Sequence, residues 1–361
     1  MGRNDWDSPL PIQSFSENYR EALNCSQEID LKQLIFHETK EKGDAHWIQS
    51  YKAKGKFDEN TGTFVKQAAL DRPSGAIPRR MWEALKESDR TFAAWMKRIT
   101  PHQDIDFYMT LCDKQETETG HEFENRDKLD MMNDPTNPTL RLLADGFIVK
   151  SNQRVLDAIT ASTTVRKMLD MNNASENFGK VVVKTENWKD NNPYAEYETE
   201  FEGYLSIFDD MPELEARLEA CAVPHGMRKI ILINTFDVAL IKKKNKEALF
   251  NNQFPFVTAE DVRSGNLPEI FGFSWVKTRQ VPRGTMIGFV PEAISMVPYL
   301  DLEQSLDTDI LMRNHIFWYA HEEYGFVRND DMGAFVIKYK QPAASGGSGG
   351  GSAGTEETDG K

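Results

Sequence analysis

The sequence predicts a protein of the α+β class, with a long helix, a buried sheet and an extended, poorly packed beginning. Apolar side chains recur every three or four positions from Leu140 to Ile159, which is the period of a helix that buries one face. Residues 228–234 form a nearly all-apolar run after a Pro/Gly turn, which is typical of a strand buried on both faces. Residues 37–80 instead alternate polar with apolar positions and are interrupted by glycines, which predicts an extended β-hairpin.

Composition limits the class of protein further. The chain has 361 residues, enough for roughly two or three domains, and 39% hydrophobic residues supply a packed core. It carries 57 acidic against 43 basic residues, a formal charge of −14, which excludes a basic reader of nucleic-acid sequence. Three cysteines far apart exclude a disulfide scaffold. We find neither a signal peptide nor a membrane-spanning segment, so we expect a soluble protein that is not exported.

The beginning of the chain offers little material for a core of its own. Residues 1–36 are expected to form an arm, and residues 37–82 an extended loop shaped as a β-hairpin. A two-stranded ribbon is only marginally stable by itself in water, so this loop needs a surface to lie on. The aromatic side chains of Trp47 and Phe64 are equally consistent with contacts to a neighbouring molecule and with packing on their own domain.

The long helix is expected at about 139–160. A polar segment with two prolines precedes it, and proline is well tolerated at or before the first turn of a helix. Gly146 lies inside it and lowers helix propensity by about 1 kcal/mol relative to alanine. We interpret this glycine as a sign of close packing or of a bend, and we assign Phe147 to the core.

The region 176–295 is expected to form a mixed α/β lobe. Helices are predicted to begin at Asp210 and near Phe236, and strands are predicted at 180–184, 228–234, 267–276 and 286–290. Structural roles are assigned by residue type: Pro224 and Gly226 set the turn into the buried strand, Gly272 allows a close approach, and Ile231 and Phe273 belong to the core.

The end of the chain divides into a folded and an unfolded part. Residues 310–339 are predicted to form a strand, a turn and further strands. Residues 341–361 contain seven glycines and three serines and end on an acidic sequence. Such a composition buries too little apolar surface to offset chain entropy, so we expect disorder there.

The residues that mark an enzyme are not found at the spacings that chemistry requires. The sequence contains no P-loop, no GxSxG nucleophile motif and no zinc-spaced Cys/His set. The segment from His321 begins like the zinc motif HExxH but has Gly325 in place of the second histidine. His315 and His321 would lie roughly 20 Å apart on one strand, too far to share a metal. We therefore expect no catalytic residue, no metal and no cofactor.

Charged clusters have both a functional and a structural interpretation. Adjacent acids at 209–210, 322–323 and 330–331 would suit acid–base chemistry, but in so acidic a chain we expect them to be solvated loop charges. Four lysines at 242–246 would suit a phosphate group. We expect them instead at a solvated helix end, where they complement the helix dipole.

The order of these elements resembles that of the major capsid proteins of tailed bacteriophages with the Hong Kong 97-type fold. The segments that carry the resemblance are, in order, LRLLADGFIVKSNQRVLDAIT, VPHGMR with KIILIN, SGNLPEIFGFSWVKTRQVP and GTMIGFVPEAISMV. In that family a Val-Pro turn precedes an Arg-led apolar strand, and a Gly-x-Leu/Ile segment leads to a Gly-Phe pair. The matching positions are Val223, Pro224, Arg228, Gly265, Leu267, Ile270, Gly272 and Phe273. The resemblance covers about residues 125–340.

The resemblance implies the domain organisation of that family. It divides the chain as follows: 1–36, N-terminal arm; 37–82, extended loop; 83–175, first part of a peripheral domain with a spine helix at about 139–160; 176–295, axial domain; 296–340, return strands of the peripheral domain. The Gly/Ser-rich residues 341–361 lie outside the shared pattern.

The resemblance also implies a structural role. A protein of this kind assembles through hexamers and pentamers of itself into an icosahedral shell around double-stranded DNA, which it does not read. Scaffold, portal and decoration proteins are further partners that the family suggests, with assembly in the host cytoplasm, the virion as location and no membrane. Two alternatives stay open: an encapsulin-type compartment shell, and a cytosolic α/β enzyme with an unrecognised site.

Overall fold

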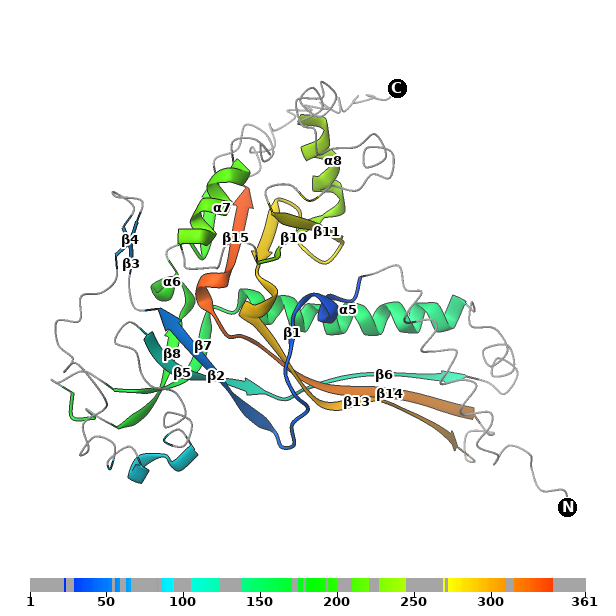
Figure 1. The fold of residues 1–361 in the computed structure, drawn as a ribbon. Helices are drawn as coiled ribbons and strands as arrows, with labels where there is room; N and C mark the ends of the chain where they lie inside the picture. The colour runs from blue at the N-terminus through cyan, green and yellow to red at the C-terminus, as the bar shows by residue number, and fades with distance from the viewer. Residues whose placement is uncertain are drawn as a thin grey trace, which may run out of the picture.

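The described part of the chain forms three multi-stranded sheets, a two-stranded ribbon and several helices (Figure 1). The computed structural model describes residues 29–53, 56–58, 63–65, 86–91, 105–123, 138–170, 175–177, 180–192, 194–199, 210–220, 227–244, 272–309 and 315–339, and the single residues 23, 83, 93 and 269. The predicted turn residues Pro224 and Gly226 and the predicted tail 341–361 lie outside these ranges. No helix in the described part is both long and apolar enough to cross a membrane.

The first sheet is a long layer covered by the predicted spine helix. Helix α5 (Pro138–Thr160) lies along strands β13 (Ile294–Asp309), β14 (His315–Arg328) and β6 (Gln115–Phe123) (Figure 1). The two-residue strand β1 (Phe36–His37) joins the outer edge of β13. The face of α5 that carries Ala144, Phe147 and Val155 is buried. The apolar residues that recur every three or four positions in the sequence are therefore the ones that pack against the sheet.

The second sheet holds the apolar centre of the molecule. Its strand order is β11 (Phe273–Thr278), β10 (Lys229–Asn234), β12 (Thr285–Phe289), β15 (Ala334–Tyr339) and β9 (Glu196–Thr199). Every residue of β10 is buried, as a central strand covered on both faces requires. Helices α7 (Asp210–Ala220) and α8 (Thr235–Lys244) lie against this sheet through buried residues such as Leu214 and Ile241 (Figure 1).

The third sheet joins strands that are distant in sequence. Its order is β2 (Ala45–Ala53), β5 (Ile105–Asp113), β7 (Thr163–Leu169) and β8 (Val181–Asn187), with the one-turn helix α6 (Trp188–Asn191) directly after β8. Strands β3 (Lys56–Asp58) and β4 (Thr63–Val65) pair as a separate ribbon. Short 3₁₀ turns complete the fold: η2 (Leu31–Leu34), η3 (Pro291–Ala293) and η4 (Asp331–Gly333).

The described part of the first eighty residues packs on its own body more than the sequence predicted. Leu31 and Ile35 belong to the main core cluster, and Ile48 of β2 is also buried. Strand β2 pairs along its whole length with β5 in antiparallel register, so the alternating pattern at 45–53 finds its partner about sixty residues later in the chain. The expectation of a beginning without its own core therefore fails for residues 29–37 and 45–53, while β3 and β4 pair only with each other among the described strands.

Two single residues refine the sequence analysis. A Cβ added to Gly146 would meet no atom within 4 Å, so close packing does not explain this glycine. Cys112, the cysteine among the described residues, is free and buried, and burial raises its pKa to about 12, so its thiol stays protonated and unreactive near neutral pH.

Candidate functional site: a buried polar junction of three sheets

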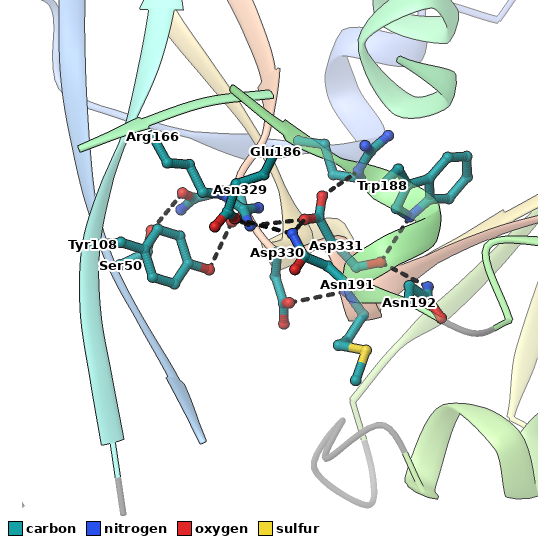
Figure 2. Close-up of polar contacts among 12 residues, drawn as sticks. Ser50, Tyr108, Arg166, Glu186, Trp188, Asn191, Asn192, Asn329, Asp330 and Asp331 are labelled. Atoms are coloured by element: carbon teal, nitrogen blue, oxygen red, sulfur yellow. Dashed lines mark hydrogen bonds and ion pairs between the residues drawn. The ribbon is translucent and has the colours of Figure 1, made fainter. Parts of the chain in front are cut away.

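A buried polar junction lies where the three sheets meet (Figure 2). We define the polar junction by Arg166, Glu186, Trp188, Asn191, Asn192, Arg328 and Asp331. Arg166 comes from β7 of the third sheet and Arg328 from the end of β14 in the first. Asp331 opens η4, the turn that leads into β15 of the second sheet. Each sheet therefore sends a charged residue, or the turn that carries one, to the same point.

The carboxylate of Asp331 is the centre of the junction. Its side chain is 1% exposed and lies 2.7 Å from Arg166 Nη1. Arg328 Nε donates to its other oxygen at 2.9 Å, and Asn191 Nδ2 donates at 2.9 Å. A buried carboxylate is costly unless it is paired and hydrogen-bonded, and here both oxygens have cationic partners.

Arg328 connects the junction to the end of the spine helix. Its guanidinium is fully buried and donates to the carbonyl oxygens of Ile159 and Ala161 at 2.6 and 2.7 Å. Those carbonyls lie in the last turn of α5 and directly after it, where helix carbonyls have no partner within the helix. Arg328 also lies over the Trp188 ring, 4.1 Å from its centroid. Burial is the main cause that lowers the Arg328 pKa.

Arg166 connects the junction to the third sheet. Its Nη1 contacts Glu186 Oε2 at 2.9 Å as well as Asp331, and its guanidinium lies 4.6 Å from the Tyr108 ring centroid. Tyr108 in turn donates from its hydroxyl to the Asn329 carbonyl at 2.9 Å. Desolvation by burial is the main cause that raises the pKa of this phenol, so it remains a neutral hydrogen-bond donor.

Backbone groups of η4 are held by side chains from α6 and from the residue after it. Trp188 Nε1 and Asn192 Nδ2 both donate to the Asp331 carbonyl, at 2.9 and 2.7 Å. Asn192 Nδ2 also donates to the Ala334 carbonyl at 2.9 Å, at the first residue of β15. The junction therefore pairs the carboxylate of Asp331 and also hydrogen-bonds the backbone of the turn between the first and second sheets.

The arrangement serves structure rather than chemistry. Two arginines face two carboxylates, so the formal charges balance, and every one of these groups is held by a neighbour. Within the described ranges, no group of three or more His, Cys, Asp or Glu residues is placed to hold a metal ion. The geometry therefore fits a buried contact that joins the three sheets.

A second contact ties the N-terminal segment to strand β14 and to the spine helix α5. Lys32 Nζ lies 2.8 Å from both carboxylate oxygens of Glu322, whose side chain is 3% exposed. Asn152 of α5 accepts from the Leu31 N–H at 2.8 Å and donates to the Ile29 carbonyl at 2.7 Å. Residues 29–32 are thus bound through main chain and side chain at once. We call Lys32, Glu322 and Asn152 the N-terminal clamp.

The acidic pairs were misjudged from the sequence. Glu322 and Asp331 are buried and paired, whereas both were expected to be solvated loop charges. Strand alternation offers a signal for Glu322, because buried Trp318 and Ala320 lie on the same face of β14. For Asp331 the one local signal is Arg328, three residues earlier; its other partners, Arg166 and Asn191, come from β7 and α6.

The predicted structural residues are placed as follows. Phe147, Ile231 and Phe273 are buried, at 2%, 0% and 0% exposure, and none of them lies in the polar junction. Gly272 has φ +71°, which an L-residue adopts only with strain. A Cβ there would lie 3.4 Å from Glu215 Oε1, an ordinary contact, so the backbone conformation rather than a close approach requires glycine.

Comparison with known proteins decides the fold. No protein-family model matches the sequence, and no curated protein matches it. The solved capsid structure of cyanophage P-SCSP1u matches 87% of this chain and 89% of its own, with a TM-score of 0.52 at 10% sequence identity. The chain has a phage capsid fold. The predicted α+β, Hong Kong 97-like capsid fold is confirmed at this level.

Two further solved structures match most of the chain. A virus-like particle from Pyrococcus furiosus matches 90% of this chain and 98% of its own, at 9% identity and a TM-score of 0.48. A structure from Mycobacterium phage Che8 matches 86% and 91%, at 12% identity and a TM-score of 0.49.

Proposed function

We propose that this chain is the major capsid protein of a tailed bacteriophage. In this proposal it assembles through hexamers and pentamers of itself into an icosahedral shell that encloses double-stranded DNA. The observation that carries the proposal is the capsid fold shared with the cyanophage structure over 87% of the chain. Assembly in the host cytoplasm, the domain organisation of the sequence analysis, and scaffold, portal and decoration partners belong to the same proposal.

Exposed apolar side chains support self-assembly. Leu142 and Val149 lie two turns apart on α5 and are 72% and 40% exposed. Residues seven positions apart share a helix face, so the spine helix presents these two apolar side chains, which we call the exposed apolar strip, to solvent in the single subunit. Val183 on the edge strand β8 is also exposed. A subunit that buries such positions against copies of itself gains the burial that the monomer lacks.

The charge of the chain supports enclosure of DNA without recognition. A net charge of −14 is unsuited to a tight sequence reader, whose affinity depends on basic groups that neutralise phosphates. A shell has to surround DNA without adhering to it at every subunit. The acidic balance therefore favours a container over a binding protein.

Sizing of the purified protein tests the proposal. We expect light scattering coupled to size-exclusion chromatography to show rings or megadalton particles, and cryo-electron microscopy to show closed shells with six- and five-fold clusters. A stable small oligomer under all conditions would contradict the proposal and favour the enzyme alternative. Shells whose native content is a protein cargo rather than a genome would favour the compartment alternative.

A further inference from the structure

Three buried polar atoms of the third sheet have no hydrogen-bond partner in the described part of the chain. They are Thr110 Oγ1 on β5, and Thr164 Oγ1 and Arg166 Nε on β7. The three residues are 0%, 5% and 2% exposed. Buried polar atoms are paired in nearly all folded proteins, and an unpaired one costs free energy. We call these three residues the Thr–Arg triplet.

The strand register brings the Thr–Arg triplet to one place in the sheet. Thr110 lies directly opposite Arg166 in the antiparallel pair of β5 with β7, an arrangement that separates two Cβ atoms by roughly 5 Å. Thr164 is two positions from Arg166 on the same strand, so both side chains point to the same face. This face carries the polar junction, because Arg166 itself belongs to the junction and its guanidinium lies 4.6 Å from the Tyr108 ring centroid.

The remaining nitrogens of Arg166 are already engaged. Nη1 contacts Glu186 at 2.9 Å and Asp331 at 2.7 Å, and Nη2 donates to the Asn329 carbonyl at 3.4 Å. Within the described residues, Nε is the nitrogen of this guanidinium that lacks an acceptor. Because Nε carries a hydrogen and no lone pair for bonding, whatever pairs with it has to accept a hydrogen bond.

The three atoms together have the chemistry of an internal water site. The oxygen of a water molecule accepts from Arg166 Nε–H, and its two hydrogens are donated to the hydroxyl oxygens of Thr110 and Thr164. About three hydrogen bonds to otherwise unpaired buried groups are typical of an internal water. One small molecule therefore pairs all three atoms of the triplet.

The charges around the triplet favour this neutral ligand over an anion. The two arginines of the polar junction already face two carboxylates, those of Glu186 and Asp331. A bound anion would add a negative charge without a cation to balance it, and a buried charge of that kind is costly.

We propose that Thr110, Thr164 and Arg166 hold one internal water molecule, which connects strand β5 to the polar junction. The junction then extends beyond its charged residues, because its arginine is joined through the water to both threonines. The two hydroxyls are retained inside the fold for this contact. Their removal should therefore destabilise the subunit.

The substitutions Thr110→Val and Thr164→Val test the proposal by the sign of their effect. Valine keeps the shape of threonine and lacks the hydroxyl, so removing a hydroxyl that has no partner would raise the folding equilibrium constant. If the hydroxyls hold the water, we expect each substitution to lower that constant about five- to thirtyfold, because Arg166 Nε–H is left unpaired. Urea unfolding of the full-length, unassembled subunit, followed by tryptophan fluorescence, measures the change.

A double variant and a matched control complete the test. Thr110→Val with Thr164→Val should lose little more than either substitution alone, because the same water cannot be expelled twice. Thr185→Val, at an exposed position of β8, should change the constant by less than about twofold. Single variants as stable as the wild type or more stable, losses that multiply in the double variant, or an equal loss in Thr185→Val would each overturn the proposal.

A crystal structure of the wild type tests the site without relying on the variants. The crystals are grown with bromide in place of chloride, at a resolution that shows ordered water. We expect a density peak within hydrogen-bond distance of all three atoms that has no anomalous signal. An anomalous bromide peak there would assign an anion, and the lack of any peak would show that the atoms stay unpaired; either result would overturn the proposal.

Discussion

At the scale of single residues, Asp331 holds parts of the fold together in a way that no sequence motif predicted. It is the anion shared by Arg166 and Arg328, which come from different sheets. Removing one partner of a buried ion pair leaves the other charges uncompensated, and this costs more than the pair itself contributes. The polar junction is therefore a point where one carboxylate controls the stability of the whole arrangement.

The variant Asp331→Asn should lower the free energy of unfolding by about 3–5 kcal/mol, because two buried guanidinium groups lose their common counter-ion. Urea unfolding followed by tryptophan fluorescence measures it. Asp301→Asn is the matched control, since Asp301 pairs with Lys40 on the surface at 72% exposure and such pairs contribute little. Equal effects of the two substitutions would contradict the role of the junction.

Two glycines offer an opposite pair of predictions. Gly146→Ala should raise the free energy of unfolding by about 0.5–1 kcal/mol, because the added methyl group meets no atom within 4 Å and alanine favours the helix. Gly288→Ala should lower it by about 1–3 kcal/mol, because the new methyl group would overlap the Phe335 ring on the neighbouring strand. Thermal unfolding of both variants measures the signs, and a stabilising Gly288→Ala would show that the β12–β15 contact is loosely packed.

At the scale of elements, the N-terminal clamp makes residues 29–37 part of the body. Burial is the main cause that raises the pKa of Glu322, opposed by Lys32 and supported by Asp30. The folded state therefore holds a proton on Glu322 at a higher pH than the unfolded state does. Such a group adds stability below its unfolded pKa, and this contribution is lost as the pH rises through the folded pKa.

The effect of Glu322 on the pH dependence of stability can be measured by comparing the wild type with the variant Glu322→Gln, whose side chain does not titrate. As the pH falls from 7 to about 4.5, we expect the wild type to gain stability relative to the glutamine variant, because only the wild type takes up a proton at this position. Urea midpoints at several pH values measure the difference. Glu323→Gln, one residue further on the opposite strand face, serves as a control; parallel curves for wild type and Glu322→Gln would refute the assignment.

Strand β10 is the element on which the second sheet depends. Ile231→Asp should abolish the soluble folded subunit, because it places an unpaired charge in a strand buried on both faces. Val183→Asp, at a position 58% exposed on β8, should leave the soluble yield unchanged. The measurement is the soluble fraction after expression, with circular dichroism of what is recovered. A normal yield of Ile231→Asp would contradict the buried position of this strand.

At the scale of the whole molecule, the exposed apolar strip of α5 links the fold to assembly. We expect Leu142→Ser with Val149→Ser to leave the thermal midpoint of the isolated subunit nearly unchanged, since both side chains already face solvent. The same change should reduce the yield of particles, because apolar area that copies would bury is lost. Light scattering and electron microscopy measure the yield, and an unchanged yield would remove this strip from the contacts between subunits.

Regular, one-sided patterns determined much of this protein from the sequence alone. The helix predicted at about 139–160 occupies Pro138–Thr160, and the buried strand predicted at 228–234 is β10 at Lys229–Asn234. These elements depend on residues that are neighbours in the chain, so their periodicity is visible without any partner. The order of these elements carried the resemblance to the capsid fold, and the acidic composition excluded a basic reader of nucleic-acid sequence.

Only the tertiary structure decided where distant segments meet. Strand β2 pairs with β5, Lys32 reaches Glu322, and Arg166 reaches Asp331, although nothing local in the sequence connects these positions. The free energy of a buried charge depends on the partner that folding brings to it, and a partner more than a hundred residues away leaves no trace in a local pattern. Local periodicity therefore fixed the elements, and long-range polar contacts fixed how they are joined.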